Sequence, residues 1–469
     1  MSIYLNNYWT LYQEFMDTFH ELKFRGIPIA MVTNFYQQID DALKAKMEKD
    51  DFYTELKTPV MKQTMIQPYF ESFLEKVRAP IVSKENTGKI LINADYTRMT
   101  ALTYKRWINP QRTLILTRSK STQVFGIPTE HIENYQEDNA KILKELETNA
   151  ALIFKKYKGH PAFENEYFQK TFLNRIPLIV KTISSVFNLF NKSNISIIVV
   201  GTTEDILSRC LAIVGAAKGI KSICLQHGIL MGEEAFMPVF TSIVGVYGEY
   251  EKTWYLQRGV TAERIAAVGH PKYDDIFTYS PGNKEAFLKS FGLNANKLTL
   301  LVITGPNIDF IKFNKLIKNI VDNPRFQIVI KPHPWEIGKR KYDVYLDFEK
   351  QYQSVKVLTS RVDNLYELIS HADGVVSSLS TVVSESILFN KPVFIFNFLI
   401  SNRTYDYYDS FGDYIQTDPD ALSKIVNRYY NSNQEREKYL SIRNQYLSKF
   451  YNDGSSGKKL INLIKLATK

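Results

Sequence analysis

Short continuous runs of Val, Ile and Leu recur along this chain, and they constrain its fold more than any other feature. Examples are "ISIIVVG" (195–201), "LTLLVITGP" (298–306) and "FQIVIKPHP" (326–334). Runs of about five apolar residues without polar alternation are typical of strands covered on both faces, as in a parallel sheet. Helical patterns separate the runs, so the sequence predicts an α/β fold with doubly wound parallel sheets.

Two groups of predicted strands divide the chain into halves. In the first half, strands are predicted at 88–95, 112–118, 195–201, 221–228 and 242–248. In the second half, they are predicted at 298–306, 326–334, 354–360, 373–378 and 391–397. We therefore expect two Rossmann-like domains whose parallel sheets face a central cleft.

The predicted domain boundaries follow these patterns. Residues 1–80 have apolar and aromatic residues at helical spacing and form an N-terminal helical segment. Residues 81–280 and 281–420 form the two Rossmann-like domains, with Pro281 and Gly282 at their border. Residues 421–469 are expected to form helices that pack back on the body.

The composition is typical of a water-soluble globular protein. Hydrophobic residues make up 44% of the chain and charged residues 23%, and no apolar run is long enough to span a bilayer. The first residues lack a basic segment followed by an apolar one, so we expect no secretory signal and a cytoplasmic protein. Cys210 and Cys224 lie in apolar segments and are expected to be reduced core thiols.

The net charge is +10, from 59 basic and 49 acidic residues. The basic residues are dispersed, and no run resembles a nucleic-acid-binding arm, so no nucleic-acid partner is expected. One interpretation of the excess is a solvated basic surface. The alternative is that it attracts an anionic partner, such as a nucleotide, a phosphorylated acceptor or the acidic inner face of the cell membrane, where a peripheral contact is expected. The charge alone does not choose between them.

His333 follows a predicted strand and lies between Pro332 and Pro334, two residues after Lys331. Proline restricts its own φ and biases the preceding residue toward extended backbone, so His333 is constrained from both sides. An imidazole held in this way is a preorganised donor for a diphosphate or a leaving phosphate. A rigid loop with a solvent-facing histidine is the simpler alternative.

His-Pro pairs are more frequent than chance predicts. With seven histidines and 17 prolines in 469 residues, fewer than one pair is expected, yet pairs occur at His160, His270 and His333. Two of the three end predicted strands, which favours a functional interpretation of the pattern.

A second candidate site lies in "ADGVVSSLSTVVSESILFNKPVFIF" (372–396). Four hydroxyl side chains occur between its strand and its helix, at Ser377, Ser378, Ser380 and Thr381. The first N–H groups and the positive end of a helix favour phosphate. Glu385 shares a helix face with Thr381 and is placed to accept hydrogen bonds from two ribose hydroxyls. Plain N-capping with an exposed glutamate is the alternative.

In the first half, Gln226, His227 and Gly228 end the strand at 221–228. Gly228 allows a close approach of the backbone to a ligand, and His227 is a candidate general base for an acceptor hydroxyl. A structural histidine at a strand end is the alternative. Glu204 or Asp205 could be the base instead, although acids in the first turn of a helix are common as partners of the helix dipole.

Several chemistries lack their motifs. There is no P-loop, no Gly-rich dinucleotide fingerprint after a strand and no nucleophile elbow of the α/β-hydrolase type. No His, Asp or Glu cluster has metal-ligand spacing, so no metal site and no cofactor are predicted.

The combination of "VIKPHP" with "VVSSLSTVVSES…KPVF" resembles the His-Pro and Ser-Ser motifs of bacterial GT-B glycosyltransferases that build surface polysaccharides. These are the sialyl- and polysialyltransferases, the Kdo transferases of capsule assembly and the CDP-glycerol glycerophosphotransferases. "LQHGIL" and "VGHPKYDDI" resemble motifs of the glycerophosphotransferases and of the UDP-N-acetylglucosamine 2-epimerases. The resemblance covers roughly residues 195–400.

The resemblance implies a metal-independent GT-B enzyme whose second domain holds a nucleotide-activated sugar. The implied donor-side residues are Thr304, Gly305, Lys331, Pro332, His333, Ser377, Ser378, Ser380, Thr381 and Glu385. The acceptor, a glycan or a lipid-linked glycan, would lie against the first domain near Gln226, His227 and Gly228. The glycerophosphotransferases usually show Trp-His-Gly-Thr, whereas Gln226 precedes His227 here and Ile229 follows Gly228. This departure favours a sugar transferase. A glycerophosphotransferase, a nucleotide-sugar epimerase and a non-catalytic scaffold are the alternatives.

Overall fold

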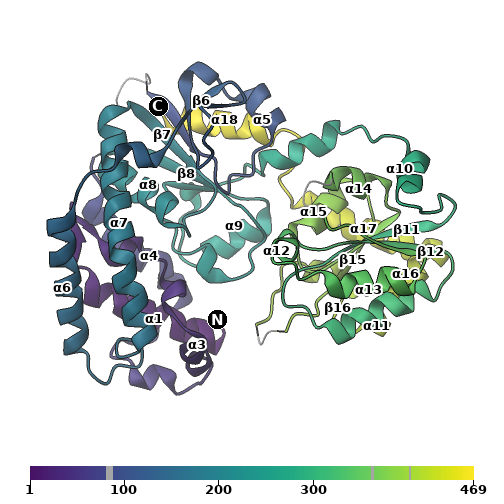
Figure 1. Cartoon of the computed structure of the whole chain (residues 1–469), viewed down its shortest axis with the longest axis horizontal. Coiled ribbons are helices and arrows are strands. Elements are labelled where there is room, and N and C mark those ends of the chain that lie inside the picture. The colour runs from purple at the N-terminus through teal and green to yellow at the C-terminus, as the bar shows by residue number, and fades with distance from the viewer. Residues whose placement is uncertain (81–87, 361–363, 401–402, 469) are drawn as a thin grey trace. The chain divides into compact units, whose positions relative to one another are not determined.

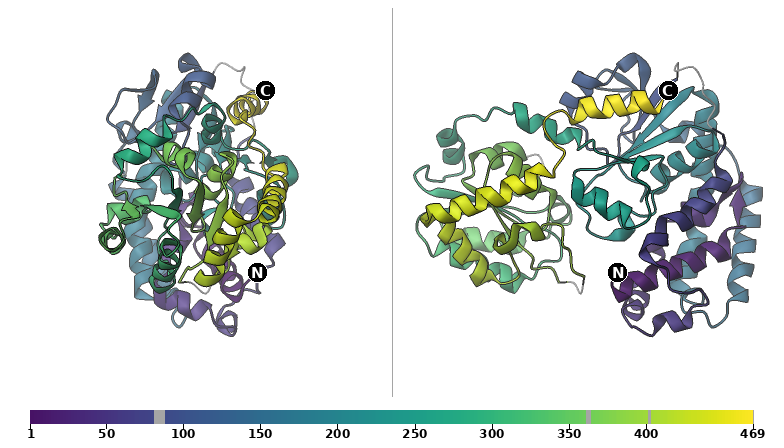
Figure 2. Two further views of the ribbon diagram at one scale, coloured as in Figure 1. Left: turned by 90° about the vertical axis from the view of Figure 1, so that its right-hand side faces the viewer. Right: turned by 180° about the vertical axis from the view of Figure 1, so that it is seen from behind.

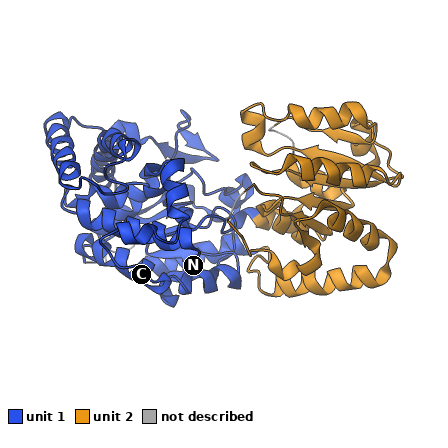
Figure 3. Ribbon diagram, turned by 90° about the horizontal axis from the view of Figure 1, so that it is seen from below, with its two compact units in different colours: residues 1–272, 455–469 blue, residues 273–454 orange. Residues whose placement is uncertain are grey.

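The structure is a computed structural model that describes residues 1–80, 88–360, 364–400 and 403–468. It divides into two compact units, which Figure 3 shows in different colours. The first unit comprises residues 1–272 and 455–469, and the second comprises residues 273–454.

The first unit contains an eight-stranded sheet in the order β10-β9-β8-β7-β3-β4-β6-β5. Its strands are β3 (Lys89–Asn93), β4 (Thr113–Leu116), β5 (Gln123–Val124), β6 (Ile127–Glu130), β7 (Ile195–Val200), β8 (Lys221–Leu225), β9 (Ile243–Gly245) and β10 (Ile265–Ala266). All neighbouring strands pair in parallel except β5 with β6. The chain runs outward from β3 through β4 to β6 and then returns to β7 on the other side of β3. The strand order therefore reverses between β3 and β7.

Helices cover both faces of this sheet (Figures 1 and 2). On one face, Ile197 and Ile223 pack in one apolar cluster with side chains of α5 (Ala101–Trp107) and α18 (Ser456–Ala467). On the other face, Gly215 of α8 (Ile206–Ala217) lies against Ile198. Adjacent residues of β7 thus face opposite helix layers, which explains its uninterrupted apolar sequence.

The N-terminal residues form a helical layer in the same unit. Its helices are α1 (Ile3–Phe19), α2 (Ile29–Val32), α3 (Asp41–Met47) and α4 (Ile66–Val77), with a short hairpin of β1 (Lys23–Phe24) and β2 (Ile27–Pro28). Stacked and tilted rings join them to α7 (Glu166–Lys192), as in the Phe15 contacts with Phe35 and Phe172. α6 (Ala140–Lys156) packs against α7. Residues 1–80 are mainly helical, as predicted.

The second unit contains a six-stranded sheet in the order β13-β12-β11-β14-β15-β16. Its strands, all paired in parallel, are β11 (Leu298–Ile303), β12 (Phe326–Lys331), β13 (Val355–Val357), β14 (Gly374–Ser377), β15 (Val393–Phe396) and β16 (Ile415–Gln416). The strand order reverses between β11 and β14.

The helices of the second unit also form two layers. One layer holds α11 (Phe310–Val321), α13 (Asp343–Gln351) and α16 (Pro419–Asn431), and the other holds α14 (Leu365–His371) and α15 (Thr381–Leu388) (Figure 1). The remaining helices are α10 (Lys284–Ser290), α12 (Pro334–Gly338) and α17 (Asn433–Ser448). The predicted α/β class with parallel sheets is confirmed.

The compact units divide the chain by packing. The chain passes from the first unit to the second between Lys272 and Tyr273, and the predicted domain border is at 280/281. The predicted boundary at 80/81 adjoins residues 81–87, which lie outside the described part. Of the C-terminal helices, α16 and α17 belong to the second unit, whereas α18 returns to the first, where Leu460 and Ile464 are buried. The predicted division of the chain into four segments stays a prediction, because the compact units are defined by packing and do not show which segments fold independently.

Gly201 provides a test of the packing between the ends of β7 and β3. A Cβ at this position would lie 2.1 Å from the carbonyl carbon of Tyr96 and 2.3 Å from the amide nitrogen of Thr97. Gly201→Ala should therefore lower the free energy of unfolding by about 1–3 kcal/mol, measured by urea denaturation. Gly228→Ala is the control, because a Cβ there would meet nothing within 4 Å. Equal stability of the two variants would contradict the close approach.

Candidate functional site

The predicted site residues gather at the reversal point of each sheet. In open parallel sheets, this position forms a crevice at the carboxyl ends of the strands, where ligands bind. In the second unit it is bordered by Thr304 after β11, His333 after β12 and Ser378 after β14. In the first unit it is bordered by the loop after β3, Gly201 after β7 and His227 after β8.

His333 is the N-cap residue of α12, and its imidazole is held by that role. Nδ1 accepts a hydrogen bond from the backbone N–H of Trp335 at 3.1 Å. Pro334 occupies the first helical position, where a missing N–H costs nothing. Because Nδ1 is the acceptor, the neutral ring carries its proton on Nε2. His333 therefore presents a hydrogen-bond donor whose tautomer and direction are set by the helix cap.

The other two His-Pro pairs have the same local geometry. Nδ1 of His160 accepts from the N–H groups of Ala162 and Phe163 at 3.2 and 3.0 Å, and Nδ1 of His270 accepts from Lys272 N–H at 3.1 Å. Both side chains are buried, whereas His333 is partly exposed. The excess of His-Pro pairs thus reflects a capping turn with proline after the cap, and a functional interpretation rests on the exposure of His333 alone.

Glu336 joins the ends of β11 and β12 beneath His333. Its Oε2 accepts hydrogen bonds from the Thr304 hydroxyl at 2.5 Å and from the His333 N–H at 2.9 Å. Its Oε1 accepts from the Tyr345 hydroxyl at 2.7 Å, and burial together with this carboxylate raises the pKa of Tyr345. The sequence analysis missed Glu336, although its position three residues after His333 is that of the acid in a capping box.

The hydroxyl-rich segment after β14 lies on the other side of the reversal point. Ser380 is the N-cap of α15, and its hydroxyl accepts a hydrogen bond from Val382 N–H at 3.3 Å. The Tyr408 hydroxyl donates to the Ser380 carbonyl at 2.7 Å, which fixes the helix start from outside. A Cβ at Gly305 would lie 2.7 Å from Ser378 Oγ, so the ends of β11 and β14 are in close contact.

The predicted donor-side residues divide by exposure. Ser380, Thr381 and His333 are partly exposed. Buried members of the set are Thr304, Gly305, Lys331, Pro332, Ser377, Ser378 and Glu385. The Ser377 hydroxyl donates to the Ser378 carbonyl at 2.9 Å, and the Lys331 ammonium donates to the Ser360 carbonyl. Glu385 is 5% exposed rather than on an open face.

In the first unit, His227 lies against aromatic rings. Its ring is stacked on Phe236, with centroids 5.2 Å apart and planes 17° apart, and it meets Tyr96 edge-on at 6.1 Å. Burial, and after it the positive charge of Arg98, lower the pKa of His227 to about 4, although a hydrogen bond with the Gly201 backbone acts in the opposite direction. The ring is therefore neutral at physiological pH.

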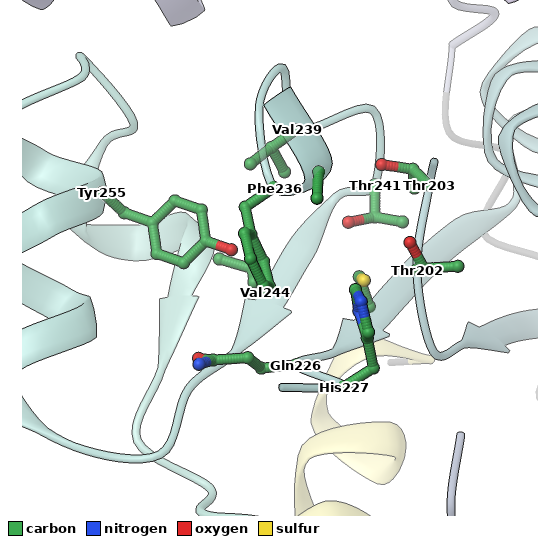
Figure 4. Close-up of a pocket in the computed structure, with 11 residues that line it drawn as sticks. Thr202, Thr203, Gln226, His227, Phe236, Val239, Thr241, Val244 and Tyr255 are labelled. Carbon is green, nitrogen blue, oxygen red and sulfur yellow. The ribbon is translucent and has the colours of Figure 1, made fainter. Parts of the chain in front are cut away.

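A small pocket adjoins His227 (Figure 4). Five polar side chains line it. Thr202 and Thr203 follow β7, Gln226 and Thr241 lie in the connection between β8 and β9, and Tyr255 belongs to α9 (Glu249–Leu256). Its cavity volume of about 20 Å³ suits one hydroxyl-sized group rather than a sugar ring. Oε1 of Gln226 is buried and accepts no hydrogen bond from the described residues, so the pocket offers an acceptor as well as the imidazole.

The acidic candidates of the first unit lie apart from this pocket. Asp205 is the N-cap of α8, where its Oδ1 accepts from Ser208 N–H at 3.0 Å. Burial raises the pKa of Glu204, and the charge of Arg209 opposes that shift. Burial also raises the pKa of Asp95, which forms an ion pair with Arg118 at 3.0 Å. Of these acids, none lines the described pocket.

The sequence analysis missed the loop after β3 and the aromatic wall at Phe236. "ADYTR" follows a predicted strand, so the rule that ligands bind at strand ends could have drawn attention to Tyr96 and Arg98. Both adopt positive φ, 64° and 51°, in the turn that packs against Gly201. Nothing in the local sequence connects Phe236 with His227.

The described ranges contain neither a metal-binding cluster nor a membrane-spanning helix. In these ranges, no group of three or more His, Cys, Asp or Glu side chains is placed to hold a metal ion. No helix in the same ranges has the length and apolar character needed to cross a membrane. Both cysteines are free thiols, and burial raises the pKa of Cys224 to about 12.

One family model matches the chain. Residues 309–398 match the family described as capsule polysaccharide biosynthesis protein. The matched segment includes β12, β14 and α15, and therefore His333, Thr381 and Glu385. No curated protein sequence matches the chain.

Solved structures share the fold. Anabaena HepE in complex with UDP and glucose is 15% identical, with a TM-score of 0.50 over 81% of this chain and 99% of that one. S. aureus MnaA with UDP is 12% identical, with a TM-score of 0.53 over 81% and 96%. The UDP-GlcNAc 2-epimerase of Methanocaldococcus jannaschii is 14% identical, with a TM-score of 0.50 over 81% and 99%. At such identities the likeness concerns the fold, which is the expected GT-B class.

Replacing Glu336 tests its role in joining the strand ends. Glu336→Ala would remove the buried carboxylate that accepts from the Thr304 and Tyr345 hydroxyls, and it would leave the His333 N–H with Thr304 Oγ1 alone. We expect a loss of about 2–4 kcal/mol in the free energy of unfolding of the second unit, measured by urea denaturation. Tyr345→Phe removes only one of the three hydrogen bonds and should cost about 1 kcal/mol. Similar losses in the two variants would contradict the central role of Glu336.

His227 should make stability depend on pH. Its folded pKa of about 4 lies below the ordinary histidine value of about 6.5, so the unfolded state binds the proton more readily between these values. Stability is therefore lost as the pH falls from about 6.5 to 4. His270, whose pKa burial also lowers, adds to the same slope. Urea midpoints at pH 7 and pH 5 should differ less in His227→Gln than in the wild type, and an unchanged difference would contradict the assignment.

Proposed function

We propose that this protein is a glycosyltransferase of bacterial surface-polysaccharide synthesis. It would take a sugar from a nucleotide-activated donor, such as a CMP- or UDP-sugar, and transfer it to a glycan or lipid-linked acceptor. The proposal is supported by the family match over residues 309–398, by the GT-B fold and by the residues that gather at the strand ends of the second unit. HepE and MnaA, whose structures hold UDP, share this fold.

The proposal depends most on the positions of His333 and of the start of α15. They follow β12 and β14, the two neighbours of β11 in the sheet. His333 offers an Nε2–H whose direction is set by its cap, and α15 offers the first N–H groups and the positive end of a helix. The two are linked through neighbouring strand ends, because His333 N–H donates to Thr304 Oγ1 at 3.1 Å and Gly305 lies against Ser378. Two such groups would hold the phosphates of a donor, with Glu385 directed to the ribose.

In the proposed reaction, the acceptor hydroxyl oxygen forms a bond to the anomeric carbon of the sugar. The bond between that carbon and the phosphate oxygen breaks, and the nucleotide leaves with the electron pair. His227, neutral at physiological pH, would receive the hydroxyl proton, with Glu204 or Asp205 as less favoured bases. A cavity that suits one hydroxyl is consistent with this role.

The charge on the leaving phosphate would be met by His333, Lys331 and the α15 dipole, so the proposal includes no metal or cofactor. We further propose that the enzyme acts in the cytoplasm, where nucleotide-activated donors are made. Its excess of basic residues would favour a peripheral contact with the acidic inner face of the membrane.

Donor binding by His333 can be separated from helix capping. Asparagine is a good N-cap residue, so His333→Asn should keep α12 while removing the Nε2–H. We expect its affinity for the nucleotide to fall about 10- to 100-fold, because a hydrogen bond to a charged group contributes about 1.5–3 kcal/mol. A thermal-shift series with UDP, CMP, CDP, GDP and dTDP first identifies the nucleotide, and titration calorimetry then measures its affinity.

The matched control is His160→Asn, which makes the same replacement at a buried His-Pro turn in the first unit. It should leave the nucleotide affinity unchanged. Wild-type affinity in His333→Asn, or no nucleotide that raises the melting temperature, would overturn the donor site. Incubation with the donor alone tests the reaction class, because an epimerised sugar nucleotide formed without acceptor would identify an epimerase.

A further inference from the structure

The connection between β8 and β9 is unusual for a parallel sheet. Parallel neighbours are normally joined through a crossover helix. Here residues 226–242 contain only the single 3-10 turn η6 (Glu233–Ala235). Long connections without a helix are uncommon in compact domains and are often functional. We call residues 226–242 the β8–β9 loop.

This loop is buried, although it lacks a helix of its own. Apolar side chains at Ile229, Leu230, Met237, Val239 and Phe240 are all shielded from solvent. The shielding comes partly from the N-terminal helices, which contact the loop at two places.

The first contact is made by Trp9 of α1. Its indole N–H donates to Oε1 of Glu233 at 2.6 Å. Oε2 of the same carboxylate accepts from Arg258 Nε at 2.8 Å, and the guanidinium of Arg258 lies 3.6 Å from the Trp254 ring centroid. Glu233 is therefore buried with both oxygens occupied, which fixes one end of η6.

The second contact is made by Gln67 of α4. Its amide nitrogen donates to the Val239 carbonyl at 2.9 Å, and its amide oxygen accepts from the Val239 N–H at 2.8 Å. The side chain thus pairs with Val239 in both directions, as a neighbouring strand would. The Arg264 guanidinium also donates to the Val239 carbonyl, at 3.0 Å.

Phe236 lies between these two contacts, three residues from each. Its ring stacks on His227 and lines the same pocket, as does Val239 (Figure 4). The elements that hold Phe236 in place are therefore α1 and α4, far from His227 in the sequence.

We propose that the N-terminal helices are a positioning element for the first-unit site: through Trp9 and Gln67 they hold the β8–β9 loop so that Phe236 stays stacked on His227. The assignment of His227 to the acceptor side rests on the proposed function, whereas the contacts themselves do not. Trp9, Gln67 and Glu233 are positioning residues, because they act through Phe236.

The consequence can be measured on the imidazole itself. Phe236 covers one face of the His227 ring, and the other groups that face it are Tyr96 and Arg98 from the loop after β3, the Gly201 backbone and His270. Loosening the loop would admit water to the covered face and ease protonation of the ring. The positive charge of Arg98 would remain where it is.

The test compares two full-length variants that each remove one buried side-chain amide from the N-terminal helices. Gln67→Met loses the pairing with Val239. Asn7→Leu, the matched control, loses hydrogen bonds from Asn7 Nδ2 to the carbonyls of Met47 and Lys49, at 2.8 and 3.0 Å, and leaves the loop untouched. The His227 ring is titrated by NMR, its signal being identified by its loss in His227→Gln.

We expect the His227 titration midpoint to rise by at least about one pH unit in Gln67→Met and to stay at the wild-type value in Asn7→Leu, although both variants melt at lower temperature. Trp9→Phe keeps an aromatic ring but removes the indole N–H that donates to Glu233, so it provides the readout if Gln67→Met does not fold. A wild-type midpoint in the folded variant would overturn the proposal. Absence of sugar transfer in the wild type would refute the proposed function without affecting this titration.

Discussion

The parallel arrangement of strands is the constraint on which the rest of this structure depends. It brings the carboxyl ends of neighbouring strands to one edge of each sheet, and the reversal of strand order opens that edge between β3 and β7 and between β11 and β14. Each predicted site segment follows a strand that lies at or beside a reversal point. Segments more than 70 residues apart in sequence, such as those holding Gly305 and Ser378, meet there in direct contact.

Helix capping is the second organising interaction. At His270 and His333, which precede a 3-10 helix and α12, an imidazole nitrogen replaces the side-chain oxygen of an ordinary N-cap, and the same contact closes a turn at His160. Proline follows each histidine at a position where its missing N–H is harmless. The same arrangement serves a structural purpose where the ring is buried and leaves a directed donor where it is partly exposed. Accessibility, rather than the motif, separates the two.

Much of the fold could be predicted because its signals are local. The apolar runs at β7, β11 and β12 identified strands covered on both faces, and the start of α15 at Thr381 followed from its Ser380 cap. The short strands β1, β2, β5, β6 and β16 were missed, since two to four residues carry little periodicity. The return of α18 to the first unit was beyond local patterns, because its partners at α5 and the sheet lie hundreds of residues earlier.

The sequence by itself determined the elements, the order of the strands along the chain and the residue types at the strand ends, because these depend on short-range periodicity and capping. Only the tertiary structure decided which of those residues meet. Glu336 contacts Thr304 across two strand ends, Phe236 covers His227 from a loop without a motif, and Trp9 reaches Glu233 over a separation of 224 residues. Such contacts depend on how buried polar groups find partners in the folded chain, which no local pattern encodes.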